Sequence, residues 1–259
     1  MANSLALLYI ARGRDDDALG RFRRFVRAYR AHVPGAEHDL FVVFKGFDDN
    51  QKLQEARSVF EGLRYSSIST DDDNFDIGAY RAATSQIEHG LIGLVNSSAE
   101  PNCDGWIGKL LSNLGPDVGA VGATGSFESL NALDSSIPSF PNVHLRSNGL
   151  IMRREDLLVM FPERIPDKLS AFHVESGPNS FTRQFFKRGM SVLVVGKDGR
   201  GLPPARWPEC QGFRQGAQSN LLVHDNVTRL FENSAHVVKC ALTRGSWGGL
   251  ASQFEISPN

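Results

Sequence analysis

Cysteine is scarce in this sequence. The 259 residues contain three cysteines, at positions 103, 210 and 240, and no CxxC pair. A disulfide framework is therefore not indicated, and we expect a reduced, cytoplasmic protein. Long apolar runs are lacking too, since no stretch approaches the ~18 apolar residues that a membrane-spanning helix needs. The apolar stretch 4–11 is short and follows no basic segment, so we expect a strand there rather than a signal sequence.

An excess of charge of one sign is also missing. The chain has 28 Lys and Arg against 29 Asp and Glu, a formal net charge of −1, and this balance gives no reason to expect a nucleic-acid partner. One basic cluster stands out, RFRRFVRAYR at 21–30. Its Phe22, Phe25, Val26 and Tyr29 recur at helical spacing, which predicts an amphipathic helix with a solvated arginine face rather than a DNA-binding patch.

Apolar runs alternate with helical patterns through the first half of the chain. The predicted strands are 4–11, 38–47, 65–70, 91–96 and 117–124, and the predicted helices are 18–33, 50–63, 76–90 and 104–114. This alternation indicates βαβ units and a mostly parallel sheet with helices on both faces. The strands are apolar without alternation, as expected when both faces of a sheet are covered. The fold class predicted is α/β.

The second half is less regular, but it shows no linker or repeat, so we expect one domain over 1–259. The pattern predicts a strand then a helix in 143–161, a helix at 180–189, a strand at 191–196 and a loop at 197–213. Loops of that length inside a domain are usually functional or mobile. From Thr243 on, apolar periodicity is weak and loose order is expected.

One stretch carries a family resemblance, DNFDIGAYRAATSQIEHGLIGLVNSSAEPNCDGWIGKLL at 73–111. It resembles the GT-A glycosyltransferases, especially the family-2-like enzymes and the rhamnan-synthesis type of bacterial polysaccharide transferase. The residues that carry the resemblance are Asp76, Gly78 and Arg81, then Val95, Asn96, Ser97, Ser98 and Pro101, and finally Trp106. It implies a GT-A fold in which 1–125 binds the nucleotide sugar and 126–259 forms the acceptor half and a C-terminal tail.

The resemblance also implies where the donor lies. The residues expected around the nucleotide are Ala11, Arg12, Lys45, Asp76, Gly78 and Arg81. Asp76 would accept hydrogen bonds from the base or ribose, and Arg81 would approach a diphosphate. A helix N-cap or first-turn role suits Asp76 equally well.

The cluster Asn96, Ser97 and Ser98 departs from the family. In the resembling enzymes an aspartate at the position of Ser98 coordinates a divalent ion, and a neutral hydroxyl is a poor ligand for such an ion. Glu100 is a candidate substitute, or the exposed start of the next turn. The run TDDDN at 70–74 invites comparison with a displaced DxD element, but its position favours a solvated or capping loop. Mg²⁺ or Mn²⁺ therefore stays an open cofactor, with its usual ligand absent.

Without a metal ion, cations, hydroxyls or backbone N–H groups must stabilise the leaving group. The candidates nominated from the sequence are Lys197 and Arg200 in GKDGRG, as part of a loop that closes over a diphosphate.

The catalytic base is sought in the second half. HLRSNGLIMRRE at 144–155, which contains Asn148, matches a strand and helix start of the family. Glu175 stands at the first acid of an expected acidic pair, and Ser176 replaces the second. We predict Glu175 as the base, with His173 on the same face of a strand as an assistant. The alternatives are an N-terminal helix acid for Glu175 and a structural role for His173.

The function predicted is an inverting transfer of a sugar from a nucleotide-diphosphate sugar to a hydroxyl of a glycan, a lipid-linked glycan or a small molecule, metal-independent because of Ser98. Peripheral membrane association stays open. The alternative is a catalytically degenerate domain that binds nucleotide sugar or a partner without turnover. A nucleotidyltransferase is disfavoured because no glycine-rich lysine motif lies near the first strand, and an oxidoreductase because no GxGxxG follows it.

Overall fold

The computed structural model describes residues 4–249. Its centre is an eight-stranded sheet with the order β11-β10-β6-β9-β4-β1-β2-β3. The strands are β1 (Leu5–Arg12), β2 (Asp39–Lys45), β3 (Ser66–Ser69), β4 (Leu91–Val95), β6 (Val118–Gly122), β9 (Leu150–Arg153), β10 (Ser191–Val195) and β11 (Gly201–Leu202). Only β9 and β11 run antiparallel to their neighbours within this sheet. The predicted α/β class with a mostly parallel central sheet is confirmed.

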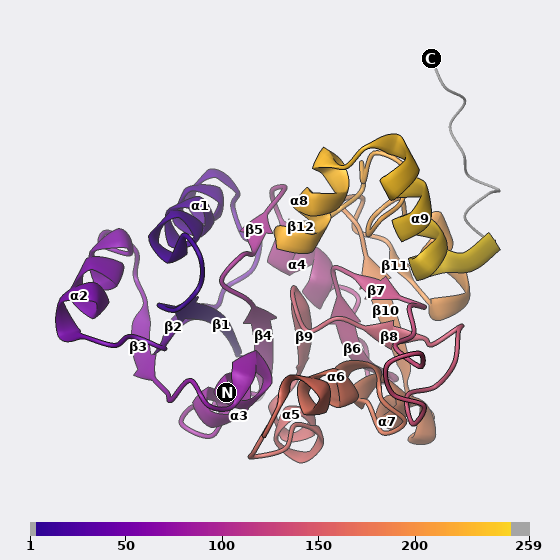
Figure 1. Ribbon diagram of the computed structural model, residues 1–259. Coiled ribbons are helices and arrows are strands. Elements are labelled where there is room, and N and C mark those ends of the chain that lie inside the picture. Colours follow the sequence, from indigo (N-terminus) through magenta and orange to yellow (C-terminus); the bar gives the residue numbers. More distant parts are fainter. Residues whose placement is uncertain (1–3, 250–259) are drawn as a thin grey trace.

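Helices cover both faces of this sheet (Figure 1). They are α1 (Ala18–Ala31), α2 (Asn50–Val59), α3 (Phe75–Thr84), α4 (Trp106–Leu111), α5 (Arg154–Met160), α6 (Lys168–Ser176), α7 (Phe181–Lys187), the 3₁₀ helix η1 (Pro204–Glu209), α8 (Asn226–Asn233) and α9 (His236–Trp247). Two small sheets pair β7 (Gly125–Ser126) with β8 (His144–Leu145), and β5 (Glu100–Pro101) with β12 (Val223–His224). Within residues 4–249, none of these helices has the length and apolar character to cross a membrane.

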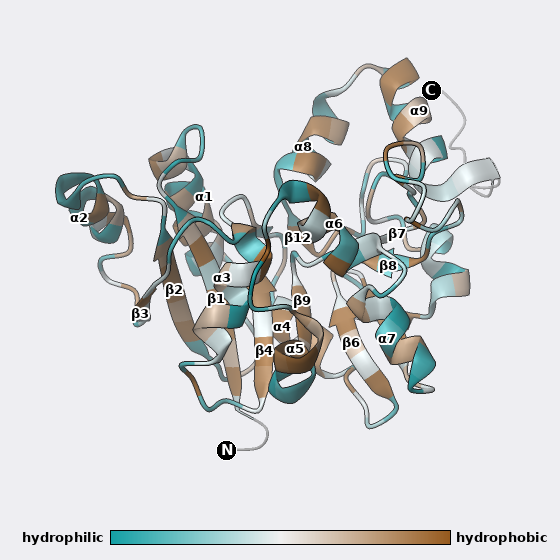
Figure 2. Ribbon diagram, turned by 60° about the horizontal axis from the view of Figure 1, so that its bottom comes forward, coloured by the Kyte–Doolittle hydropathy of each residue, from teal (hydrophilic) through white to brown (hydrophobic). Residues whose placement is uncertain are grey.

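The core consists of two apolar layers, one on each face of the sheet. Leu7 and Tyr9 of β1 pack with Phe22 and Phe25 of α1 in one layer. Leu8 belongs to the other layer, which includes residues of α3, α5 and α7. Successive side chains of a strand point to opposite faces, so both faces of β1 are buried. Figure 2 shows the result, with apolar central strands and a hydrophilic outer helix α2.

Three expectations about the elements were wrong. The helix predicted over 76–90 ends at Thr84. The segment of His173 and Glu175 is the helix α6, where a strand was expected. The chain after Thr243 continues in α9 to Trp247, whose side chain is 2% exposed, so it is held by packing. Within the loop predicted over 197–213, the structure adds β11 and η1. The remainder of the predicted loose segment, 250–259, lies outside the described residues.

Candidate functional site

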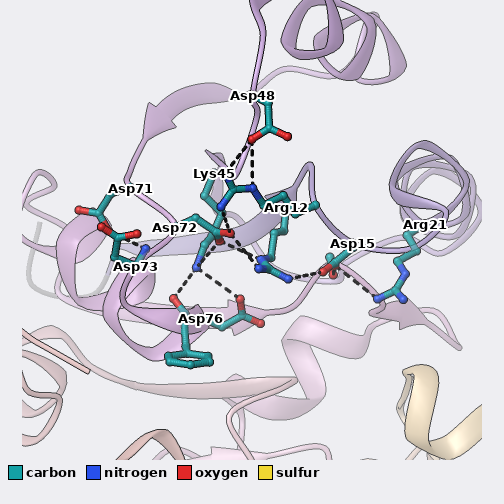
Figure 3. A network of polar contacts seen from close by, with 12 residues as sticks. Arg12, Asp15, Arg21, Lys45, Asp48, Asp71, Asp72, Asp73 and Asp76 are labelled. Atoms are coloured by element: carbon teal, nitrogen blue, oxygen red, sulfur yellow. Dashed lines mark hydrogen bonds and ion pairs between the residues drawn. The ribbon is translucent and has the colours of Figure 1, made fainter. Parts of the chain in front are cut away.

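The register of the sheet brings two of the predicted donor residues, Arg12 and Lys45, to one edge. Arg12 at the end of β1 pairs with Lys45 at the end of β2, and Tyr9 pairs with Val95 of β4. The carboxyl ends of these parallel strands therefore meet, as is common for ligand sites in α/β sheets. We call the six residues gathered there the charged network (Figure 3): Arg12, Asp15, Arg21, Lys45, Asp72 and Asp76.

Arg12 joins two carboxylates of the charged network. Its Nε and Nη2 donate to the two carboxylate oxygens of Asp72, each at 2.8 Å. Its Nη1 donates to Asp15 Oδ1 at 3.1 Å. The hydrogen bonds that Arg12 donates to Asp72 raise the pKa of Arg12 above its ordinary value. A two-pronged pair of this kind fixes the guanidinium plane as well as its charge, so Arg12 is rigidly placed.

Lys45 is the most deeply buried cation of the charged network. Its side chain is 0% exposed, and Nζ donates to the carbonyl of Phe75 at 2.5 Å. Asp72 Oδ1 lies 3.3 Å and Asp76 Oδ1 3.9 Å from the same nitrogen. Burying an ammonium group is costly unless such partners compensate it. The backbone of Phe75, with φ of 51° in the left-handed region, is therefore tied to the lysine.

The two aspartates beside Lys45 differ in their electrostatics. Burial alone would raise the pKa of Asp72, but the hydrogen bonds from Arg12 and the charge of Lys45 hold it below its usual value. Burial raises the pKa of Asp76, and the charge of Lys45 opposes this without cancelling it. The side chain of Asp76 is 40% exposed and that of Asp72 only 7%. Asp76, in the first turn of α3, is thus the acid free to meet a ligand.

Asp72 was missed by the sequence reasoning. The run 70–74 was interpreted as a solvated or capping loop, and the exposed Asp71, which accepts from the amide of Asp73, fits that interpretation. Asp72 does not fit it, because its carboxylate is buried between Arg12 and Lys45. The signal that could have identified Asp72 was its position shortly after the end of β3, at the same edge of the sheet as Arg12 and Lys45.

A cavity lies beside the charged network, with a volume of about 330 Å³. Its lining comes from the segments that follow β2 and β3 and from Arg14, Phe44, Leu53 and Asp72. Arg14 is held by Asp48, with Nη2 2.7 Å from Oδ1. The walls combine aromatic and charged side chains, a composition suited to a ligand with a flat ring and polar substituents.

Ser98, the residue at the family's metal-ligand position, contacts an arginine. Arg21 Nη1 donates to Ser98 Oγ at 2.9 Å and lies 3.3 Å from Asp15 Oδ2. Ser97 Oγ donates to the same oxygen of Asp15. The amide of Ser98 donates to Asn96 Oδ1 at 3.0 Å. The prediction of a solvated arginine face on α1 was wrong for Arg21, whose side chain is only 24% exposed.

Glu100, the substitute metal ligand considered from the sequence, is also held by arginines. Arg229 Nη1 donates to Glu100 Oε1 at 2.7 Å, and Arg24 Nε lies 3.4 Å from it. Arg229 Nη2 donates to the carbonyl of Ser98 at 2.9 Å. A divalent ion here would have to displace guanidinium groups of the same charge sign. Within residues 4–249, no group of three or more His, Cys, Asp or Glu side chains is arranged to hold a metal ion. The residues present at this turn do not fit the divalent ion of the resembling enzymes.

Several predicted donor residues lie apart from the charged network. Ala11 is fully buried in the core. Arg81 Nη2 is 3.5 Å from Glu163 Oε1, in the loop after α5, so the contacts of Arg81 lie outside the charged network. Gly78 serves packing, because a Cβ there would stand 2.2 Å from Cβ of Asn74.

The loop cations lie at the same edge but farther along the sheet. Lys197 follows β10, which is four strands from β1 in the sheet order. At ~4.8 Å per strand that is roughly 19 Å from Arg12. Arg200 lies in the turn before β11, where its amide donates to Asp198 Oδ1 at 3.1 Å. Neither residue contacts the charged network.

The predicted base and its assistant point in different directions. Two residues apart on a helix are separated by about 200° around its axis, so Glu175 and His173 of α6 do not share a face. Glu175 Oε1 accepts from the amide of Ser147 at 2.7 Å. His173 Nε2 lies 2.8 Å from Asp134 Oδ2, in the loop before β8. The expected strand geometry is therefore wrong, and His173 has a structural partner of its own.

Asn148 links the two halves of the chain. Its Oδ1 accepts from the amide of Asn96 at 3.0 Å, and its Nδ2 lies 3.5 Å from Asp225 Oδ2. It is the neighbour of Ser147, which binds Glu175. Asn148 therefore stands between the end of β4 and the candidate base.

No family model matches this chain, and no curated protein sequence matches it. Among solved structures, mouse xyloside xylosyltransferase 1 aligns over 98% of this chain and 99% of its own, with a TM-score of 0.49 and 10% identity. A mannosyltransferase from Pyrobaculum calidifontis, solved with GDP-Man and Mn²⁺, aligns over 73% and 54%, with 0.49 and 11%. A 4-diphosphocytidyl-2C-methyl-D-erythritol synthase from Anaerococcus prevotii aligns over 75% and 89%, with 0.46 and 10%. At these values the similarities assign no reaction or ligand to this chain.

Proposed function

We propose that the protein is a glycosyltransferase of the GT-A type that moves a sugar from a nucleotide-diphosphate sugar to a hydroxyl group. The observation that carries the proposal is that Arg12, Lys45 and Arg21, with their carboxylate partners, lie at the carboxyl ends of β1, β2 and β4, where Arg21 also contacts the hydroxyl of Ser98. Cations and hydroxyl donors at one sheet edge suit a nucleoside diphosphate. The adjacent cavity suits its base.

In the proposed reaction, the acceptor hydroxyl oxygen attacks the anomeric carbon of the donor sugar from the face opposite the diphosphate. The bond from that carbon to the diphosphate oxygen breaks, and the nucleoside diphosphate leaves with the electron pair. The hydroxyl proton passes to Glu175, the candidate base. Guanidinium and hydroxyl groups, without a divalent ion, balance the charge that develops on the leaving group. Inversion at the sugar carbon follows from this geometry.

A second candidate is a domain that binds nucleotide sugar without turnover. The observation that favours it is the contact of Glu175 with the amide of Ser147. This bond already occupies Oε1 of Glu175, one of the two oxygens that would accept the proton. The two candidates share the donor site and differ only in chemistry.

The test is a screen of UDP-, GDP- and dTDP-sugars by thermal shift and calorimetry, in EDTA and again in Mn²⁺. A donor at 100 times its Kd should stabilise the fold by ~2.7 kcal/mol, or about 5–10 °C in Tm for a chain of this size. Binding in EDTA that Asp76→Asn weakens supports the donor site. Release of nucleoside diphosphate with acceptor supports the transferase, and binding without any release supports the second candidate. Absence of binding to every donor contradicts both.

A further inference from the structure

The contacts of Arg21 set it apart from the other arginines of the site. Arg12 is matched by a buried carboxylate in a two-pronged pair, and Arg229 by the carboxylate of Glu100. The best hydrogen bond of Arg21 goes to an uncharged group, the hydroxyl of Ser98, at 2.9 Å. Its one acidic neighbour, Asp15, lies at 3.3 Å and also accepts from Arg12 and Ser97. The charge of Arg21 is therefore less fully matched than that of its neighbours.

Arg21 also retains donors for a ligand. Both of its contacts are made through Nη1, and within residues 4–249 its Nε and Nη2 have no hydrogen-bond partner. The side chain is 24% exposed, so these donors are reachable. Arginine presents five N–H donors in a rigid fork that matches phosphate oxygens.

The position of Arg21 is the second part of the argument. It reaches from α1 to the turn after β4, the place where the resembling enzymes hold their divalent ion. Arg24 and Arg229 hold Glu100 at the start of β5, directly after the same turn. Arg24 and Arg229 thus stabilise this region. A third cation, Arg21, contacts the hydroxyl of Ser98 and keeps N–H groups that have no hydrogen-bond acceptor in the described part of the chain.

We propose that Arg21 binds the diphosphate of the donor and takes over the charge-balancing role that a divalent cation has in the resembling enzymes. This inference rests on the proposed function, and it replaces Lys197 and Arg200, the cations nominated from the sequence. Ser98 positions the guanidinium through its hydroxyl. An aspartate at position 98 would neutralise the charge of Arg21. The neutral serine leaves that charge available to the diphosphate.

The test compares binding of UDP, GDP and dTDP with binding of the matching nucleosides, by calorimetry in EDTA. Arg21→Gln should weaken the best nucleoside diphosphate about 10- to 100-fold, the range for losing hydrogen bonds to a charged group. The nucleoside without phosphates should bind equally well to both proteins. Arg23→Gln, which removes the same charge from an exposed position of the same helix, should change neither affinity by more than about twofold.

A second variant tests the exchange of metal for arginine directly. Arg21→Gln combined with Ser98→Asp removes the guanidinium and restores the family's carboxylate. We expect Mn²⁺ to strengthen nucleoside diphosphate binding to this double variant at least ~10-fold, with no such effect on the wild-type protein. Tm in the absence of ligand checks that each variant folds.

Three results would overturn the inference. Diphosphate binding unchanged in folded Arg21→Gln would leave the proposed function standing and remove Arg21 from it. A strict Mn²⁺ requirement in the wild-type protein would do the same. A wild-type protein that binds no nucleoside diphosphate or nucleotide sugar, with or without Mn²⁺, would refute both the inference and the function on which it rests.

Discussion

The two halves of the molecule treat their charged residues differently. In the first half, three segments that are distant in the chain, namely β1, β2 and the stretch 72–76, place Arg12, Lys45, Asp72 and Asp76 together at one edge of the sheet. In the second half, Glu175 and His173 are neighbours in the chain, yet each bonds to a different loop. The register of parallel strands brings residues from distant parts of the chain side by side. The short helix α6 instead points Glu175 and His173 in different directions. The side that we propose to bind the donor is thus fixed by the sheet, and the side that we propose to bind the acceptor by irregular segments; we call them the donor side and the acceptor side.

The largest effect should come from the acceptor side. We expect Glu175→Gln to lower kcat by about 10²- to 10⁴-fold, because the variant keeps the shape of the side chain and loses the proton acceptor. Donor affinity should not change. His173→Gln should lower kcat by less than about tenfold, because His173 contacts Asp134 instead of the reacting groups. Steady-state kinetics with calorimetry measures both, and equal losses in the two variants would contradict this division of roles.

The donor side should respond in stability. Asp72→Asn leaves Lys45 buried without its nearest carboxylate, at 3.3 Å. Breaking a buried ion pair by removing one partner costs about 3–5 kcal/mol. Asp71→Asn, the matched change at the exposed neighbouring position, should cost less than ~0.5 kcal/mol. Urea denaturation gives both values. A small loss for Asp72→Asn would show that Phe75 and Asp76 suffice to hold the lysine.

The smallest effect concerns pH. The pKa of Asp72 is lowered in the folded protein, so its contribution to stability is present above the unfolded value of ~3.9 and is lost as the pH falls. The pKa of Asp76 is raised in the folded protein. Ionisation of Asp76 therefore lowers the stability as the pH rises above the unfolded pKa of ~3.9. Denaturation between pH 3 and 7 should therefore show a shallower acid loss for Asp72→Asn and a smaller change, of opposite sign, for Asp76→Asn. Parallel pH curves for the two variants would exclude these electrostatic roles.

The sheet was largely predictable from the sequence, because both faces of strands such as β1 are buried and a buried strand is apolar throughout. The same holds for α1, whose aromatic residues recur at helical spacing. The family resemblance was enough to group Arg12, Lys45 and Asp76, which the structure places at one edge of the sheet. What a pattern cannot predict is which member of a polar run turns inward, as Asp72 does while Asp71 stays in solvent.

The acceptor side was harder for a physical reason. The segment around His173 has only two buried positions in α6, Val174 and Ser176, so no apolar period marks it as a helix. The partner of Arg21 was equally hidden, since Ser98 lies 77 residues away in the chain. Such contacts depend on how α1 is set against β4, which no local pattern encodes.

The contact of Arg229 with the turn after β4 has a consequence for the order in which parts of the structure can form during synthesis. Arg229 donates a hydrogen bond to the carbonyl of Ser98 in the turn after β4, and the two residues are 131 positions apart in the chain. During synthesis the strands β1 to β4 emerge from the ribosome long before residue 229. The turn after β4 therefore lacks its contact with Arg229 until the C-terminal part of the chain is made. Domains can begin to fold as they leave the ribosome. The proposed donor site would then be completed last, and a nascent chain would carry a formed sheet before this site is fully assembled.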